Sequence, residues 1–454
     1  MSTLASPQLP AAARLLDGDR EPASGPLRVA LFHNLPPGGA LRALYEVVRR
    51  FPEEVEVDLF VVEQGAVDRF TSLAEGTYRL DLTGVVSSTR RYSLPGALTR
   101  VASHLGRITR FVLVGEGARR AQRRMAREIN FGGYDVAFLH ACQYSLSVPI
   151  ATWLEVPCVF YAQEPRRVNY EARPGQHARV SGLSPALTEI ARRSYESLQR
   201  RRDRRAIASA DAVLCNSRFS AEALIAAYGI DPVVCYLGVD SDRFTPGPSS
   251  RLAAAHSDSV LRVASVGALH PVKGHDLALV GTALAARQLG MSAELHVAYE
   301  RERPGYASEL EHLAASLGVG LILRRGVSDD ELVALFRAAV VTVCAARLEP
   351  FGLTPLESMS CGTPVVAVAQ GGFRETVVDG LNGYLVERDA ASLAAGIVDS
   401  VSGRLDITGE DLHEHVRRRW GWDRSVERIL AELRRAADSA TGSTDGALGA
   451  EVAR

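Results

Sequence analysis

Lysine is almost absent from this sequence. Of the 52 basic residues, Lys273 is the one lysine, and all the others are arginines. An arginine guanidinium is a planar fork suited to bidentate pairing, whereas a lysine ammonium is a compact point charge, so the two are not interchangeable. The exception therefore draws attention to Lys273, although a surface loop is also an ordinary place for a lone lysine.

Features that mark several other classes of protein are missing as well. The longest apolar stretch, residues 146–162, contains Glu155 and two prolines and cannot serve as a membrane span. The first 26 residues lack a basic start followed by an unbroken apolar core, so we expect no secretory signal and a cytoplasmic protein. The six cysteines form no metal-type pairs and are expected to be reduced core residues. A net charge of −1 gives no reason to expect nucleic acid as a partner.

What the sequence does contain is a repeated alternation of short apolar runs and helical patterns. This alternation is typical of parallel sheets with helices on both faces. The apolar runs predict strands at residues 27–32, 55–62, 135–140, 158–162, 212–217 and 233–238, and again at 261–267, 293–300, 320–326, 340–346, 364–369 and 383–386.

The two sets of predicted strands are separated by a segment rich in proline, serine and aspartate, which is typical of a linker. Ligands of open parallel sheets bind beyond the carboxyl ends of the strands, so we expect a site in the cleft between two such domains. The predicted divisions are a flexible lead (1–26), a first Rossmann-like domain (27–246), a second Rossmann-like domain (247–410), a helical segment (411–438) and a disordered tail (439–454).

Lys273 lies in a sequence context that favours phosphate binding. The apolar run 261–266 is followed by Gly267, a short loop, Gly274 and a helical pattern. A glycine loop between a strand and a helix start exposes backbone amides at a positive helix end, where phosphates bind.

The segment from Glu349 to Glu357 is the most specific in the chain. It holds two glutamates eight positions apart around Phe-Gly-Leu-Thr, and the amides at the predicted helix start could accept an anion. Two interpretations of Glu357 stay open. It could contact a ligand, or it could complete a capping box with Thr354, in a helix that Gly362 ends. Glu349 precedes the helix and has no cap to serve.

These motifs resemble those of the retaining nucleotide-sugar glycosyltransferases of the GT-B fold, also called group 1 glycosyltransferases. The likeness is strongest over residues 265–386 and weaker from residue 27 onward. It implies an α/β protein with two doubly wound Rossmann-like domains facing each other across a cleft, the first on the acceptor side and the second binding the nucleotide sugar. It also implies transfer of a hexose-type sugar from a nucleoside-diphosphate sugar to a polysaccharide, lipid-linked or small-molecule acceptor, without metal or cofactor.

The resemblance assigns roles to individual residues. Lys273 would neutralise the donor diphosphate, Glu349 would bind the donor sugar, and His140 would lie near the transferred sugar. The donor would further contact Gly38, Gly39, Gly267, Phe351, Gly352, Leu353, Thr354 and Glu357. Simpler interpretations stay open for His140, as a local hydrogen-bonding residue, and for the two glycines of the first domain, as a tight turn.

Two further residues are predicted on the acceptor side. Glu164 and Arg166 follow the predicted strand 158–162, at the carboxyl edge of the first sheet. One position departs from the family pattern, because Ala268 stands where relatives commonly carry an arginine. His270, Arg374 or an arginine of the first domain could compensate. The departure keeps two alternatives open, a catalytically silent sugar-nucleotide-binding subunit and another GT-B reaction such as epimerisation of a nucleotide sugar.

Arginine-rich stretches leave the acceptor and the location open. Residues 90–127 contain ten arginines and a single acidic residue at near-helical spacing, and a second cluster spans Arg200–Arg205. Such helices either lie on an anionic membrane, here its inner face, or are ordinary solvated faces. Asp240 and Asp242 have the spacing of a metal-binding pair, but two carboxylates in a linker are an incomplete site, and we predict no metal.

Overall fold

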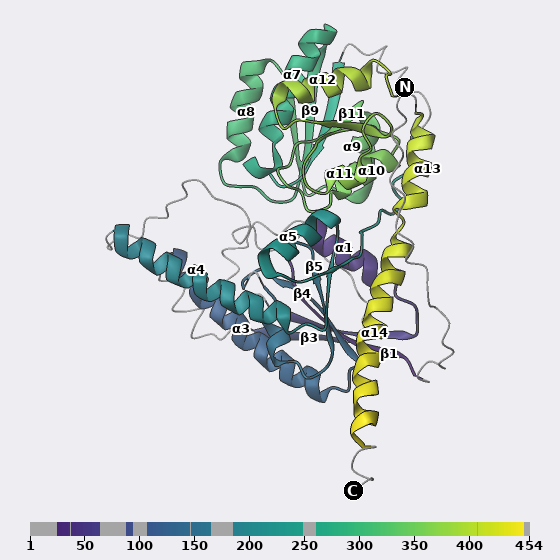
Figure 1. The fold of residues 1–454 in the computed structure, drawn as a ribbon. Coiled ribbons are helices and arrows are strands. Elements are labelled where there is room, and N and C mark those ends of the chain that lie inside the picture. Colours follow the sequence, from purple (N-terminus) through teal and green to yellow (C-terminus); the bar gives the residue numbers. More distant parts are fainter. Residues whose placement is uncertain are drawn as a thin grey trace, which may run out of the picture.

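The structure consists of two α/β domains, one above the other in Figure 1. It is a computed structural model that describes residues 25–36, 38–63, 88–93, 107–145, 147–164, 185–247, 260–405 and 407–448. All pairings between neighbouring strands in both sheets are parallel. The predicted fold class, two doubly wound Rossmann-like domains, is confirmed.

The first domain contains a seven-stranded sheet. Its strands are β1 (Leu27–Asn34), β2 (Val55–Glu63), β3 (Ser88–Ser93), β4 (Val136–Cys142), β5 (Cys158–Ala162), β6 (Ala212–Cys215) and β7 (Val233–Val234), in the order β3-β2-β1-β4-β5-β6-β7. Its helices are α1 (Gly39–Val48), α3 (Arg107–Phe131), the 3₁₀ helix η2 (Pro149–Trp153), α4 (Pro185–Ala208) and α5 (Arg218–Tyr228).

The second domain contains a six-stranded sheet. Its strands are β8 (Val260–Val266), β9 (Ser292–Tyr299), β10 (Gly320–Arg325), β11 (Val341–Cys344), β12 (Val365–Val368) and β13 (Gly383–Val386), in the order β10-β9-β8-β11-β12-β13. Its helices are η4 (Pro271–Lys273), α7 (His275–Leu289), α8 (Tyr306–Leu317), α9 (Asp329–Ala338), α10 (Leu353–Ser360), α11 (Phe373–Thr376) and α12 (Ala390–Val401), followed by α13 (Gly409–Arg419) and α14 (Trp422–Leu448).

Every strand predicted from an apolar run is present. The central strands are buried along almost their whole length, as in β5 and β12, because helices cover both faces of a parallel sheet. The six cysteines are buried and free, as expected. β3 was not predicted. The arginine spacing of residues 90–127 is near-helical, but Arg90 and Arg91 lie in a strand at the edge of the sheet, where a polar sequence is tolerated.

The C-terminal helices connect the two domains. After α13, helix α14 returns to the first domain and packs beside α1 and the ends of β4 and β5, which Figure 1 shows in yellow. Trp422, Ile429 and Leu433 are among its buried residues in this contact layer. The helix continues past the predicted end at 438 to Leu448, so the predicted disordered tail does not begin at 439; no proline interrupts these residues.

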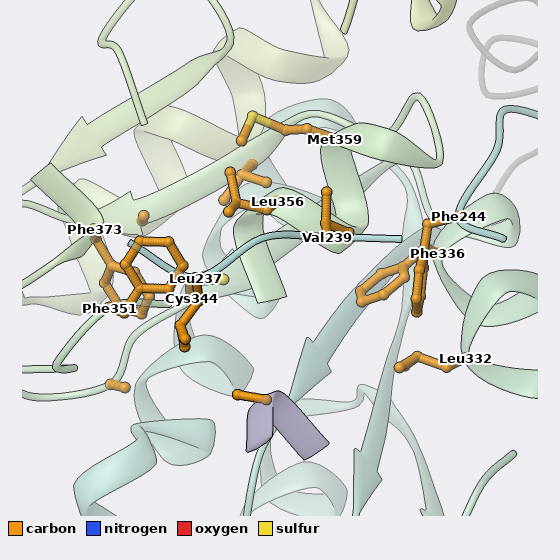
Figure 2. Close-up of a cluster of buried hydrophobic side chains, with 14 of the residues drawn as sticks. Leu237, Val239, Phe244, Leu332, Phe336, Cys344, Phe351, Leu356, Met359 and Phe373 are labelled. Atoms are coloured by element: carbon orange, nitrogen blue, oxygen red, sulfur yellow. The ribbon is translucent and has the colours of Figure 1, made fainter. Parts of the chain in front are cut away.

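The chain also crosses between the domains through a buried apolar cluster. Leu237, Val239 and Phe244 come from the segment that follows β7, and they pack against second-domain residues that include Phe336 and Leu356 (Figure 2). This packing covers the buried side of α10 and fixes its position. The predicted boundary near 247 stays a prediction, because residues 248–259 lie outside the described ranges.

No helix among the described residues combines the length and the apolar character that a bilayer span requires.

Candidate active site

Lys273 ends a short turn directly beyond β8. The His270 side chain accepts a hydrogen bond from the Val272 amide, 3.2 Å away, and so closes the turn at its start. Gly274 follows in the left-handed conformation, with φ +72°, and α7 begins at the next residue. The stem of Lys273 lies along Gly267, where a Cβ atom would meet its Cγ and Cδ at 3.4 Å. The predicted strand, loop and helix arrangement is therefore present.

A buried histidine holds this loop in place. The His275 ring is fully buried, with one nitrogen 3.0 Å from Ser265 Oγ and the other 3.2 Å from the Ala268 carbonyl. Burial lowers the pKa of His275 to about 4, so the ring is neutral at physiological pH. It is a structural anchor behind Lys273 that the sequence did not single out.

Glu349 meets Lys273 across the carboxyl edge of the second sheet. Its Oε2 lies 2.7 Å from Lys273 Nζ. The two loops are joined by a backbone hydrogen bond of 2.8 Å from the Arg347 amide to the Val272 carbonyl. Gly274 also approaches the end of β11 so closely that a Cβ atom would lie 2.4 Å from the Ala345 carbonyl oxygen. The structure thus brings together the two predicted catalytic residues of the second domain.

The loop that carries Glu349 has a constrained backbone. Leu348 is the one non-glycine residue with positive φ, at 49°, among the described residues. Gly371 and Gly372 lie directly against the loop: the Gly372 amide donates to the Glu349 carbonyl at 2.8 Å, and a Cβ at Gly371 would stand 2.3 Å from that oxygen. Strained residues of this kind concentrate at functional sites, where the surrounding structure imposes them.

Helix α10 begins at Leu353 without a side-chain cap. Gly352 is its N-cap, with φ 97°, and makes no side-chain hydrogen bond. The interpretation of Thr354 and Glu357 as a capping box is wrong, because the N-cap is Gly352, and the helix starts two residues earlier than a cap at Thr354 requires. The predicted end is confirmed: Gly362 follows the helix with φ +77°. The first amides of α10 therefore remain directed at the space in front of the helix.

Glu357 is instead bound by a residue from the other domain. It is 4% exposed, and its Oε1 lies 3.0 Å from Arg42 Nη1 on α1. Arg42 also lies 3.4 Å from Asp329 and stacks over the Phe244 ring. Burial raises the pKa of Glu357. The positive charge of Arg42 lowers this pKa, whereas the negative charges of Asp329 and Glu46 raise it further. The sequence did not predict Arg42, since contacts between domains leave no local pattern.

Two more contacts join the domains next to Glu349. The Ser217 hydroxyl, at the start of α5, donates to the carbonyl of Pro350. The Glu375 carboxylate accepts from the Arg218 and Phe219 amides at 3.0 and 2.9 Å and from Tyr236 Oη at 2.8 Å. Glu375 thus caps a first-domain helix from the second domain, and the loop that carries Glu349 is fixed from both sides.

The predicted glycine loop of the first domain faces α10. A Cβ at Gly39 would lie 3.9 Å from the Leu353 side chain, and one at Gly38 would lie 3.9 Å from Arg301 Nη2. Gly38 has φ 137°, a conformation that L side chains rarely adopt. A small pocket between the domains is lined by Arg42, Leu353 and Glu357, among others. The family resemblance predicts that these glycines contact the donor. In the structure they lie opposite the start of α10.

His140 ends up inside the first domain, in β4. It is 2% exposed, stacks on Tyr161 and contacts Phe138 edge-on. Neither ring nitrogen has a hydrogen-bond partner among the described residues, so the interpretation as a local hydrogen-bonding residue is wrong. Burial, followed by the nearby His33, lowers the pKa of His140 to about 3, and the ring is therefore neutral.

The candidates for replacing the missing arginine at Ala268 differ in position. His270 is used in capping its own turn, and Arg374 is exposed on α11. Among the first-domain arginines, Arg42 is bound to Glu357. Arg301, which was not predicted, extends toward Gly38 from the loop after β9. Its Nη2 would lie 3.9 Å from a Cβ atom at Gly38.

The remaining predicted residues are only partly described. Glu164 is exposed just beyond β5, and Arg166 lies outside the described residues. Asp240, half of the metal-like pair, accepts a hydrogen bond from Arg49 at 2.6 Å. It therefore serves an ion-pair network at the base of α1.

Comparison with known proteins places both halves of the chain among glycosyltransferases. Residues 253–418 match the family described as glycosyl transferases group 1, and residues 37–243 match glycosyltransferase family 4. The D-inositol 3-phosphate glycosyltransferase of Geodermatophilus obscurus is 34% identical over 345 residues, which is 70% of each chain. D-inositol 3-phosphate glycosyltransferase 1 of Catenulispora acidiphila is 30% identical over 424 residues, covering 89% of this chain and 92% of that one.

Solved structures share the fold at lower identity. HepE of Anabaena in complex with UDP aligns with a TM-score of 0.60 at 19% identity, covering 90% of this chain and 99% of that chain. Sucrose-phosphate synthase of Thermosynechococcus elongatus aligns with a TM-score of 0.64 at 19% identity, covering 91% and 100%. Two facing Rossmann-like domains are thus a GT-B arrangement.

Proposed function

Because this chain belongs to the group 1 glycosyltransferases, we propose that it transfers a hexose-type sugar from a nucleoside-diphosphate sugar to a hydroxyl acceptor with retention of configuration. The observation that carries this proposal is the position of Lys273, which lies 2.7 Å from Glu349, in the loop before the uncapped start of α10. An ammonium and free helix-start amides are the groups that bind a diphosphate.

The donor would be held by both loops of the second domain. Lys273 and the amides of Leu353 and Thr354 contact the diphosphate, and Glu349 turns from Lys273 to accept hydrogen bonds from the sugar hydroxyls. Glu357 accepts from the ribose. Gly267, Phe351 and Gly352 contribute backbone close to the phosphates and the sugar.

The first domain would complete the site from the other side. Gly38 and Gly39 allow close approach of donor phosphate and acceptor. The neutral His140 ring has one nitrogen that donates a hydrogen bond and one that accepts. Buried polar groups normally have hydrogen-bond partners, and here a sugar hydroxyl would provide one. Arg301, beside Gly38, supplies the cation that Ala268 omits.

In the reaction, the bond between the anomeric carbon and the diphosphate breaks while a bond to the acceptor oxygen forms on the same face. The leaving phosphate takes the proton of the acceptor hydroxyl, so no residue acts as covalent nucleophile. Lys273 and the α10 amides stabilise the negative charge that develops on the leaving group, and each such donor typically contributes about 3 kcal/mol in the transition state.

The acceptor would be a hydroxyl compound bound by the first domain, beyond β5, where Glu164 lies and where the sequence predicts Arg166 as a second contact. The relatives from Geodermatophilus and Catenulispora are named for D-inositol 3-phosphate, which makes a small phosphorylated cyclitol the first acceptor to test, ahead of polysaccharide and lipid-linked acceptors. HepE was crystallised with UDP-glucose, which makes uridine sugars the first donors to test.

The test is donor turnover by the full chain, with and without acceptors. Nucleotide release that depends on an acceptor, and a product with the anomeric configuration of the donor by NMR, are expected. Tight donor binding with no transfer across a broad acceptor panel would favour the silent binding subunit. Conversion of the donor without any acceptor would favour epimerisation.

Replacing Arg42 by glutamine is expected to make donor binding depend on pH. Glu357 must be ionised to accept hydrogen bonds from the ribose. Burial already raises its pKa, and the loss of Arg42 leaves Asp329 and Glu46 to raise it further. Donor affinity of Arg42→Gln should therefore fall as the pH decreases from about 7 to 5 and recover at higher pH.

Isothermal titration with the best nucleotide over this pH range measures the effect. Arg42→Lys, which keeps the charge, serves as the control and should show a smaller dependence. Parallel pH profiles for wild type and Arg42→Gln would contradict the role assigned to the Arg42–Glu357 pair.

A further inference from the structure

The first domain contains a second cavity, separate from the donor site. It has a volume of about 400 Å³ and is bounded by α3, the C-terminal half of α4 and the segment from Tyr144 to Trp153. This volume is within the range of about 300–1,000 Å³ that is usual for small-molecule sites. None of the residues assigned above to the donor or to catalysis lines it.

The walls of this cavity are held by specific hydrogen bonds. Gln122 on α3 accepts from the Ile150 amide at 3.1 Å, and Asn130 donates to the Trp153 carbonyl at 3.0 Å. From the other side, the Ser147 hydroxyl donates to Asp203 on α4. The segment that follows β4 is thus tied to both helices, and the cavity is a built feature of the fold.

Positive charge exceeds negative charge around the cavity. Its charged lining residues are the arginines Arg119, Arg202 and Arg205 and the acids Glu116 and Asp203. Asp203 is 2% exposed and accepts from Ser147 and from Tyr228. Glu116 is paired with Arg202. Glu116 lies 3.9 Å from Arg119, and Arg205 has no carboxylate partner among the described residues.

Among the lining residues, the surroundings of Arg119 most clearly favour an anion. Its guanidinium lies over the Trp153 ring at 5.3 Å, and it is 3.9 Å from Glu116, which is closer to Arg202. Its Nε is buried and has no hydrogen-bond partner within the described ranges. Burial lowers the pKa of Arg119, and the neighbouring Arg202 lowers it further. An anion in the cavity would relieve both the desolvation and the repulsion.

The rest of the lining is suited to hydroxyl groups. Ser145, Thr152 and Gln199 contribute polar side chains, and Tyr144 and Tyr195 contribute aromatic rings with a hydroxyl. Ser145 and Thr152 donate to the carbonyls of Ser147 and Pro149, which leaves their oxygens able to accept from a ligand.

We propose that this cavity binds a small molecule that carries a phosphate-type anion and several hydroxyls, with Arg119 and Arg205 holding the anion. The ligand comes from one of two sources with the same chemistry, a free polyol phosphate or the headgroup of a phosphorylated lipid. The site goes beyond the proposed transfer reaction, because its residues are distinct from those that hold the donor.

The test is titration of the full chain with inositol 1-phosphate in the absence of nucleotide, with unphosphorylated inositol as the matched compound. We expect binding that depends on the phosphate. Arg119→Gln and Arg205→Gln should each weaken it about tenfold or more. Arg123→Gln, an exposed change on the same helix, should leave it unchanged.

Vesicles of phosphatidylcholine with and without phosphatidylinositol 4-phosphate separate the two sources. Binding to these vesicles that soluble inositol 1-phosphate displaces would indicate a lipid headgroup, and binding of the soluble compound alone would indicate a free metabolite. Equal affinity of wild type, Arg119→Gln and Arg205→Gln, or equal affinity for the two inositols, would overturn the proposal. Lys273→Ala should bind inositol 1-phosphate like wild type, so failure here is distinguishable from failure of the proposed transfer reaction.

Discussion

Lys273→Ala should lower turnover by about a hundredfold or more, because the mutation removes the ammonium that we propose neutralises the departing diphosphate. Lys273→Arg should also be impaired: the stem lies tightly along Gly267, and a planar fork cannot take the place of a compact charge there. Both variants should keep the thermal stability of wild type, because Lys273 is partly exposed and its ion pair with Glu349 is at the surface of the cleft.

The measurement is steady-state kcat and KM with the best donor, together with the melting temperature. Arg287→Ala is a suitable control, because Arg287 is exposed on α7, the helix that follows the Lys273 loop, and should retain full activity. Wild-type turnover in Lys273→Ala would remove the basis of the assignment.

Glu349→Ala is expected to lower turnover by a comparable factor, about a hundredfold, because it removes the carboxylate that contacts Lys273 and that we propose orients the donor sugar. The effects of Lys273→Ala and Glu349→Ala should not be additive, since each residue positions the other. The double variant should therefore lose less activity than the product of the two single losses.

Stability separates Glu349 from Glu357. Glu349→Ala should leave the melting temperature unchanged, whereas Glu357→Ala should lower both donor affinity and stability, because it leaves Arg42 without its buried partner. Glu311→Ala, at an exposed position on α8, is the control. Fully additive losses at Lys273 and Glu349 would show that the two residues act independently.

The central strands of both sheets could be predicted because a strand that is buried on both faces has an almost continuous apolar sequence. β5 and β12 read as unbroken apolar runs in the sequence and are buried throughout in the structure. β3 could not be predicted in this way, since an edge strand with a polar sequence lacks that signal. The course of α14 back to the first domain was missed for a related reason: an amphipathic pattern shows that a helix is covered but not by what.

The site shows the same division between local and non-local features. The meeting of Lys273 and Glu349 follows from the rule that functional loops gather at the carboxyl ends of parallel strands. The capping box was wrong because the spacing of Thr354 and Glu357 does not reveal that the N-cap is Gly352, in a conformation that favours glycine, and that the helix starts two residues earlier. Arg42 reaches Glu357 across the cleft, and a contact between residues so far apart in the chain has no sequence signal.

Isothermal titration of wild type and Lys273→Ala with UDP, UMP and uridine is the decisive experiment for the proposed binding of a diphosphate by Lys273 and the start of α10. If uridine is not the preferred base, the same series of another nucleoside applies. Wild type should bind the diphosphate much more tightly than the monophosphate or the nucleoside, and Lys273→Ala should lose most of this difference. Equal preference for the diphosphate in both proteins would contradict the proposed binding.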